Sequence, residues 1–260
     1  NRDEPPPGGA LKKPWQRHNT RKLDAVREEI DRLSLPTVDR AVALGSLILA
    51  MDRVDSTLGH FSSYLRAWSP RSFKTAMLEV PRLFVNEHDH RVLRGDAIEA
   101  AGTNVDLAYY DPPYGSNNEK MLPSRVRYAA YYHVWTTIVM NDRPPVFGKT
   151  ARREDASDKV SSSAFEDFRR NHESGRFIAV ESIERLMHAT HARWVILSYN
   201  SGGRATAREL QDVLLANGKI HEVVELGHKR HVMAGMTWTN EWIKEDEAPN
   251  REFLFLLERD

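Results

Sequence analysis

From about residue 90 onward, short apolar runs alternate with segments of helical periodicity, and this order predicts an α/β fold with a largely parallel sheet. The stretch before it differs, because its apolar residues recur mainly at helical spacing. The chain has 260 residues, of which 40% are apolar, enough for a sizeable core. We therefore predict an α/β domain preceded by a mostly helical segment.

Composition divides the chain into three parts. Residues 1–18 are polar and rich in proline and glycine, so we predict a loop or linker. Residues 19–80 form the predicted helical segment, whose first helix is capped at Asn19 and ends before Pro36. Residues 81–260 form the predicted α/β domain.

The individual elements follow from apolar spacing and from the positions of proline and glycine. Further helices are expected at 38–54, 128–140, 178–192 and 205–217, with shorter helical pieces at 63–70 and 72–78. A short strand and turn are expected at 90–97, and strands at 105–110, 194–200, 221–227 and 252–259. Residues 141–175 are expected to be an extended loop with a short helix around Phe165.

Composition also limits the possible functions. Lys+Arg and Asp+Glu both number 37, so any case for nucleic acid must come from local basic patches. One such patch is Lys149, Arg152 and Arg153, which either holds phosphates or is solvated surface. Cysteine is absent, which excludes disulfides and thiolate metal sites and fits a reducing cytosol. We predict no metal site and no membrane span.

The run Asp111-Pro112-Pro113-Tyr114 directly follows the predicted strand at 105–110. Ligands of such sheets bind beyond the carboxyl ends of the strands. The two prolines stiffen the run and hold the Asp111 carboxylate and the Pro112 carbonyl in a fixed relation. Two adjacent acceptors suit an –NH2 group, and a ring suits a flat partner. The alternative is an ordinary turn, but the pattern favours a pocket for an aromatic amine such as that of a nucleobase.

This motif after an apolar strand resembles the catalytic motif of the amino-methyltransferases that modify DNA, and its Asp form is typical of adenine N6 methylation. Residues 131–149 (YYHVWTTIVMNDRPPVFGK) resemble the Tyr-His helix and following segment of the Dam-like adenine methyltransferases of type II restriction–modification systems. Residues 19–30, 56–68 and 194–203 resemble other segments of that group.

The resemblance implies a Rossmann-like methyltransferase sheet that uses S-adenosyl-L-methionine. Asp111, Pro112, Pro113 and Tyr114 would be catalytic, with Asp111 and the Pro112 carbonyl accepting from the adenine amine and Tyr114 stacking on the flipped base. Asp96, Ala97 and Asp111 would bind the cofactor. The expected DNA contacts are Tyr114, Asn117, Asn118, Arg125, Arg127, Tyr132, His133 and Lys149.

The chain departs from the family in two places. Gly115-Ser116 and a longer loop stand where relatives continue with Asn and an Arg-Gln-Tyr run. The family's Gly-rich F-x-G-x-G cofactor loop is absent, and the simplest account is that the chain begins after it. We expect an adenine N6-methyltransferase acting on double-stranded DNA in the bacterial cytoplasm, with a cognate restriction endonuclease. The alternatives are cytosine N4 methylation and an inactive DNA-binding relative or fragment.

Overall fold

The structure, a computed structural model, describes residues 13–65, 67–84, 86–115, 127–157, 159–227 and 251–259. Its contacts divide the chain into two compact units. The helical unit comprises residues 1–89 and 129–161, and the sheet unit comprises residues 90–128 and 162–260. The predicted α/β domain comprises residues 81–260, whereas the contacts group residues 81–89 and 129–161 with the helical unit.

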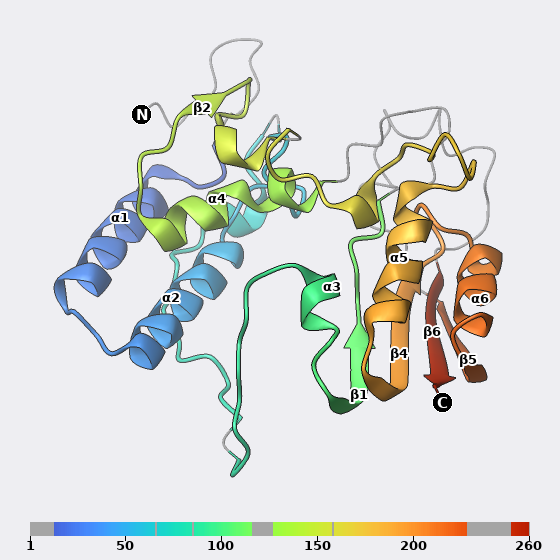
Figure 1. The fold of residues 1–260 in the computed structure, drawn as a ribbon. Helices are drawn as coiled ribbons and strands as arrows, with labels where there is room; N and C mark the ends of the chain where they lie inside the picture. The colour runs from blue at the N-terminus through green and yellow to red at the C-terminus, as the bar shows by residue number, and fades with distance from the viewer. Residues whose placement is uncertain are drawn as a thin grey trace. The chain divides into compact units, whose positions relative to one another are not determined.

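The helical unit is built on α1 (Arg17–Arg32), α2 (Thr37–Asp52) and most of α4 (Tyr128–Met140) (Figure 1). The buried residues of α1 and α2 recur at helical spacing: Asn19, Leu23, Arg27 and Ile30 in α1, and Leu44, Leu47, Ala50 and Met51 in α2. The buried core of the unit includes Trp15, Leu23, Ile30, Leu47, Met51, Phe61 and Ile138.

The predicted cap at Asn19 is wrong, because α1 begins two residues earlier and Asn19 lies fully buried inside it. The Asn19 amide instead donates to the Lys74 carbonyl at 2.8 Å and accepts from the Ala76 N–H at 2.9 Å. This pair of bonds attaches an extended segment to the helix. The helical pieces predicted at 63–70 and 72–78 are also wrong, since the described residues of these stretches form only a short 3-10 turn, Pro70–Phe73.

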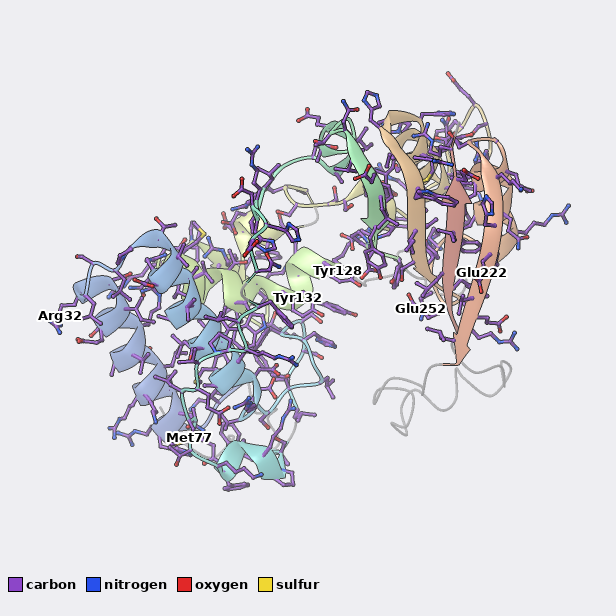
Figure 2. All side chains as sticks on the ribbon, turned by 90° about the horizontal axis from the view of Figure 1, so that it is seen from below. Arg32, Met77, Tyr128, Tyr132, Glu222 and Glu252 are labelled. Atoms are coloured by element: carbon purple, nitrogen blue, oxygen red, sulfur yellow. The ribbon has the colours of Figure 1, made fainter. Side chains whose placement is uncertain are left out.

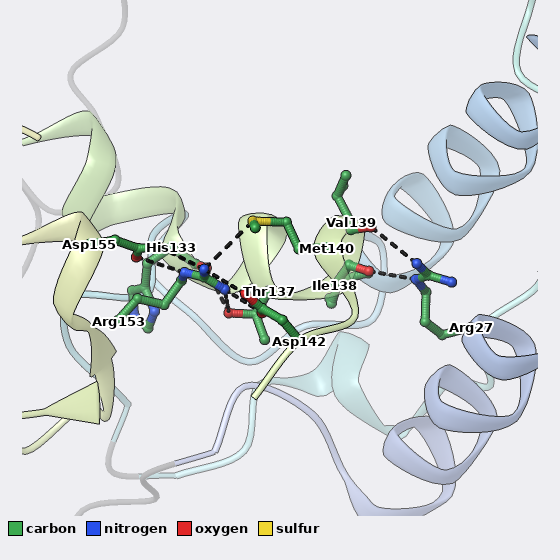
Figure 3. A network of polar contacts seen from close by, with 9 residues as sticks. All are labelled: Arg27, His133, Thr137, Ile138, Val139, Met140, Asp142, Arg153 and Asp155. Carbon is green, nitrogen blue, oxygen red and sulfur yellow. Dashed lines mark hydrogen bonds and ion pairs between the residues drawn. The ribbon is translucent and has the colours of Figure 1, made fainter. Parts of the chain in front are cut away.

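Two buried arginines organise the polar interior of the helical unit (Figure 3). Arg27 on α1 donates to the carbonyls of Ile138 at 2.6 Å and Val139 at 3.1 Å. Arg153 lies between two acids and binds Asp142 and Asp155 at 2.6 to 2.8 Å. The prediction that Arg153 belongs to an exposed basic patch is therefore wrong.

The segment that follows α4 in the helical unit carries little regular structure. It forms a two-stranded hairpin of β2 (Val146–Phe147) and β3 (Arg152–Arg153), followed by a 3-10 turn at Glu154–Ala156. Another 3-10 turn, Ala164–Glu166, lies in the sheet unit. The predicted extended loop thus contains short elements only.

The described strands of the sheet unit are β1 (Val105–Tyr110), β4 (Ala192–Asn200), β6 (Arg251–Glu258) and β5 (Lys219–Gly227), in that spatial order (Figure 1). The β1–β4 pair is parallel, while β4–β6 and β5–β6 are antiparallel. The predicted largely parallel sheet is therefore wrong for these strands. The expected strand at 90–97 is also absent: residues 90–94 are irregular, and α3 (Ala97–Ala100) follows.

Helices α5 (Ile178–Ala189) and α6 (Ala207–Leu215) pack against one face of the sheet (Figure 1). The strand register aligns Ala108, Val195 and Leu257 on this face, where Val195 and Leu257 belong to the buried core and Ala108 packs against it. Side chains alternate along a strand, so Ser198, Asn200 and Glu252 project from the opposite face. Among the described residues, no helix is long and apolar enough to cross a bilayer.

Candidate active site

The carboxyl ends of β1 and β4 meet the start of β6 at one edge of the sheet, because β6 runs antiparallel to β4. Asp111 follows β1 directly, and Glu252 is the second residue of β6, paired in register with Asn200 at the end of β4. The fold thus brings one carboxylate to each side of β4. The two acids are far apart in the sequence.

The hydroxyl of Tyr114 lies between these acids. It is within hydrogen-bonding distance of an Asp111 carboxylate oxygen, and it contacts Glu252 Oε1 at 2.8 Å and Ser198 Oγ at 3.3 Å. Ser198 Oγ also donates to Glu252 Oε1 at 2.7 Å. Burial raises the pKa of Tyr114 well above its usual value, and the bond to Asp111 raises it further. The hydroxyl therefore stays protonated at neutral pH and acts as a donor.

The backbone of Tyr114 is also fixed. Its carbonyl accepts from the Tyr199 hydroxyl at 3.1 Å and from the Arg204 backbone N–H at 2.6 Å. The Tyr114 and Tyr199 rings pack with centroids 4.9 Å apart. Burial raises the pKa of Tyr199 to about 12, so this hydroxyl also remains a donor. Gly115 then turns the chain at φ +62°, where a Cβ would lie 3.3 Å from Glu166 Cα.

A cavity of about 590 Å³ lies beside the motif, within the range of small-molecule sites. Five predicted residues line it: Asp96, Ala97, Asp111, Pro112 and Pro113. Asp96 also accepts from the Ile98 N–H at 2.7 Å and so caps α3. Two carboxylates in one cavity suit a cationic ligand that carries amines.

A larger hollow of about 990 Å³ exists elsewhere in the sheet unit. Residues 168–173 and 177–178 line it, and it contains none of the predicted site residues. The acids and the proline carbonyl, rather than size, select the smaller cavity as the candidate site.

Two of the expected DNA contacts in the described part of the helical unit are accessible. Tyr132 is 41% exposed (Figure 2), and Lys149 is also exposed. His133 is buried instead, with its ring edge-on to Phe61, and burial lowers its pKa. In this conformation His133 is a core residue.

The remaining expected contacts lie in or near the loop after the motif. Asn117, Asn118 and Arg125 lie outside the described residues. Arg127 is buried and donates to the Glu166 carbonyl at 2.5 Å, so it is engaged inside the sheet unit.

Sequence reasoning missed two charged residues near Tyr114. Arg204 is 2% exposed, and its three guanidinium nitrogens have no hydrogen-bond partner in the described part of the chain. Burial lowers its pKa, and its guanidinium lies 5.3 Å from the centre of the Phe177 ring. Glu252 was read only as the start of an apolar strand. The sequence does show a single acid, Glu252, at the start of this apolar strand. Only the antiparallel pairing of β4 and β6, however, places it beside Tyr114.

Comparison with known proteins assigns the family. The profile described as D12 class N6 adenine-specific DNA methyltransferase matches residues 10–174, more than half of the chain. The chain is 26% identical over 202 residues to the modification methylase StsI of Streptococcus sanguinis, and 24% identical over 265 residues to the type II methyltransferase M.NlaIII of Neisseria lactamica. It is 28% identical over 211 residues to the modification methylase LlaI of Lactococcus lactis subsp. lactis.

These alignments cover 76%, 96% and 75% of this chain, but 28%, 69% and 29% of the StsI, M.NlaIII and LlaI proteins. The chain thus spans less than a third of two of these relatives. No solved structure matches it. The matched range contains residues 96, 97 and 111–114, and because the profile matches more than half of the chain, the chain belongs to the D12 class of N6 adenine-specific DNA methyltransferases.

Proposed function

We propose that this chain transfers a methyl group from S-adenosyl-L-methionine to the N6 amine of an adenine in double-stranded DNA. The observation that carries the proposal is the position of Asp111 and Pro112. They lie at the carboxyl end of β1, in a cavity shared with Asp96. The family assignment agrees with this chemistry. A Rossmann-like fold, with residues 81–260 as the catalytic domain, is part of the same proposal.

The two acceptors activate the amine. One N–H donates to the Asp111 carboxylate and the other to the Pro112 carbonyl, which pulls the nitrogen toward a tetrahedral shape and localises its lone pair. The described residues make no hydrogen bond to the Pro112 carbonyl, so it is free to accept. The methylated nitrogen releases its proton easily, and in the proposal Asp111, which accepts from that nitrogen, takes it.

The residues of the cavity fit the cofactor. Asp96 uses one oxygen to cap α3, which leaves the other for the amine of an adenine ring, and Ala97 lines the wall beside it. When bound, the cofactor supplies an electrophilic methyl group. The protein aligns the amine nitrogen with that methyl group. This alignment alone can lower the activation barrier substantially.

The target base must leave the DNA stack, at a cost of a few kcal/mol. In this proposal the Tyr114 ring stacks on the flipped base and offsets part of that cost. The proposed DNA contacts include Lys149 and Tyr132, which are both exposed. Asn117, Asn118 and Arg125 are the other proposed DNA contacts. A bacterial cytoplasm and a cognate restriction endonuclease are the proposed setting.

The test is to incubate the chain with DNA and labelled S-adenosyl-L-methionine and to analyse the digested nucleosides by mass spectrometry. We expect N6-methyladenine from the wild type and none from Asp111→Ala. The matched control is Asp106→Ala, which removes an exposed acid of the same strand and should leave the yield unchanged.

Methylation by Asp111→Ala would refute the assigned role of the motif. Detection of N4-methylcytosine instead would show that the chain methylates the N4 amine of cytosine. Calorimetric titration with S-adenosyl-L-methionine distinguishes an inactive DNA-binding relative, which should bind DNA and not the cofactor.

A further inference from the structure

Glu252 is tied to the motif by more than one contact. Its Oε1 lies 2.8 Å from Tyr114 Oη and accepts from Ser198 Oγ at 2.7 Å, and its Oε2 is 3.3 Å from the side-chain amide nitrogen of Asn200. The register of β4 and β6 places Glu252 directly opposite Asn200. The carboxylate is therefore held by the sheet and directed at the tyrosine.

The number of protons sets how these groups interact. A phenol carries one proton, so the Tyr114 hydroxyl donates to only one carboxylate at a time. Asp111 and Glu252 both lie within hydrogen-bonding distance of it. Ser198 gives its own proton to Glu252, so it does not supply Asp111. When the tyrosine donates to Asp111, it occupies an oxygen that the proposed reaction needs for the substrate amine.

We propose that Glu252 is a positioning residue of the methyl-transfer site, the alternate acceptor that takes the Tyr114 proton when the amine binds Asp111. This inference rests on the proposed function and adds to it an acid from another strand. Without substrate, the hydroxyl donates to Asp111. With substrate, it turns to Glu252, and Asp111 exchanges an internal donor for the amine without leaving the hydroxyl unpaired.

A second consequence concerns the ring. Tyr114 is held at its backbone by Tyr199 and Arg204, and at its hydroxyl by Glu252. Fixing both ends of the side chain keeps the ring in one orientation while its hydrogen-bond partner changes. Ring orientation decides whether a flipped base finds a stacking partner.

The first experiment compares Glu252→Gln with the wild type. A neutral amide accepts more weakly than a carboxylate, so the tyrosine stays on Asp111 and competes with the amine. We expect kcat/KM for DNA to fall about tenfold, while the affinity for S-adenosyl-L-methionine and the thermal midpoint stay unchanged. The matched control is Glu222→Gln, an exposed acid on β5 of the same sheet (Figure 2), which should keep wild-type kinetics.

A double-mutant cycle separates positioning from a merely structural role. Tyr114→Phe keeps the ring and removes the hydroxyl, and with it the competition for Asp111. Added to Tyr114→Phe, the Glu252→Gln change should lower kcat/KM by less than about twofold, against about tenfold alone. Equal losses in both backgrounds would overturn the proposal.

A third measurement does not depend on activity. The chain has 8 tyrosines, few enough to follow by the ¹³Cζ resonance of labelled tyrosine. The Tyr114 signal is the one missing from Tyr114→Phe. It should move in Glu252→Gln and stay in place in Glu222→Gln, whereas an unmoved signal in Glu252→Gln overturns the inference.

The two proposals fail in different ways. If the wild type methylates DNA and Glu252→Gln matches it, the inference is overturned and the proposed function stands. If the wild type forms no methylated base, the proposed function fails for this chain. The Tyr114 resonance then tests the role of Glu252 without activity. A shift of this resonance in Glu252→Gln supports Glu252 as the hydrogen-bond partner of the Tyr114 hydroxyl.

Discussion

The Arg27 guanidinium donates to the Ile138 carbonyl at 2.6 Å, across 111 positions of the chain. It caps the carboxyl end of α4, where carbonyls have no partner within the helix. Arg27 is 3% exposed and also contacts Asp31 at 2.6 Å. One side chain of α1 therefore links two helices that are remote in sequence.

Arg27→Met should lower the free energy of unfolding of the helical unit by about 2 to 3 kcal/mol, because buried carbonyls of α4 lose a charged donor. Urea denaturation followed by circular dichroism measures the change. The matched control on the same helix is Arg32→Met, whose exposed side chain pairs only with Glu29. If Arg32→Met lowered the free energy of unfolding as much as Arg27→Met, the loss would come from changes to α1 itself and not from the lost cap of α4.

Asp31 makes the stability of the helical unit depend on pH. Its hydrogen bonds to Arg27, Asn141 and Arg40 lower its pKa from 3.8 to about 2. A lowered folded pKa means that the stabilisation is present above about pH 4 and is lost as the pH falls toward 2. The difference in Tm between the wild type and Asp31→Asn should therefore shrink over that range. Asp52→Asn, at an exposed acid of α2, should follow the wild type throughout.

Gly203→Ala tests the support beneath the motif. An added Cβ would overlap Tyr199 Cε1 and lie 2.9 Å from Tyr199 Cζ and 3.0 Å from the Asn200 carbonyl. Tyr199 is fully buried and has no room to retreat, so we expect a cost of about 1 to 3 kcal/mol and reduced methyl transfer. Gly227→Ala is the control, since no atom of the described residues lies within 4 Å of its added Cβ. Equal behaviour of the two variants in thermal denaturation would contradict the packing argument.

Arg204→Met should make the sheet unit about 1 to 3 kcal/mol more stable, because the guanidinium is buried without a hydrogen-bond partner in the described residues. Methionine keeps the apolar stem and the contact with Phe177. Chemical denaturation measures the gain. Arg204→Lys retains a buried charge and should show no gain, so stabilisation by lysine as well would point to another cause.

Local structure was largely predictable from the sequence. β1 has the predicted bounds, and α2, α4 and α6 lie within two residues of the predicted ends. Apolar spacing reports which side of an element is buried, and proline and glycine mark where elements stop. The place of Asp111 at the end of a strand followed from the same reasoning and agrees with the structure.

Strand direction and long-range polar contacts were not predictable. Apolar spacing is the same for parallel and antiparallel strands, so the reversal of β6 left no trace in it. Arg153 was read as part of a basic patch, and His133 as a DNA contact implied by the family resemblance. Their burial depends on partners that only the folded chain brings together, such as Asp142 for Arg153.

The strand order has a consequence for the growing polypeptide. Among the described strands, β5 pairs only with β6, which is synthesised later. At ribosomal speed the interval between them is roughly a few seconds, during which β5 has a bare edge. Its exposed Val223, Val224 and Leu226 make that edge prone to pair with another nascent chain. The same late strand brings Glu252 to Tyr114, so the proposed active site is assembled only when translation passes residue 252.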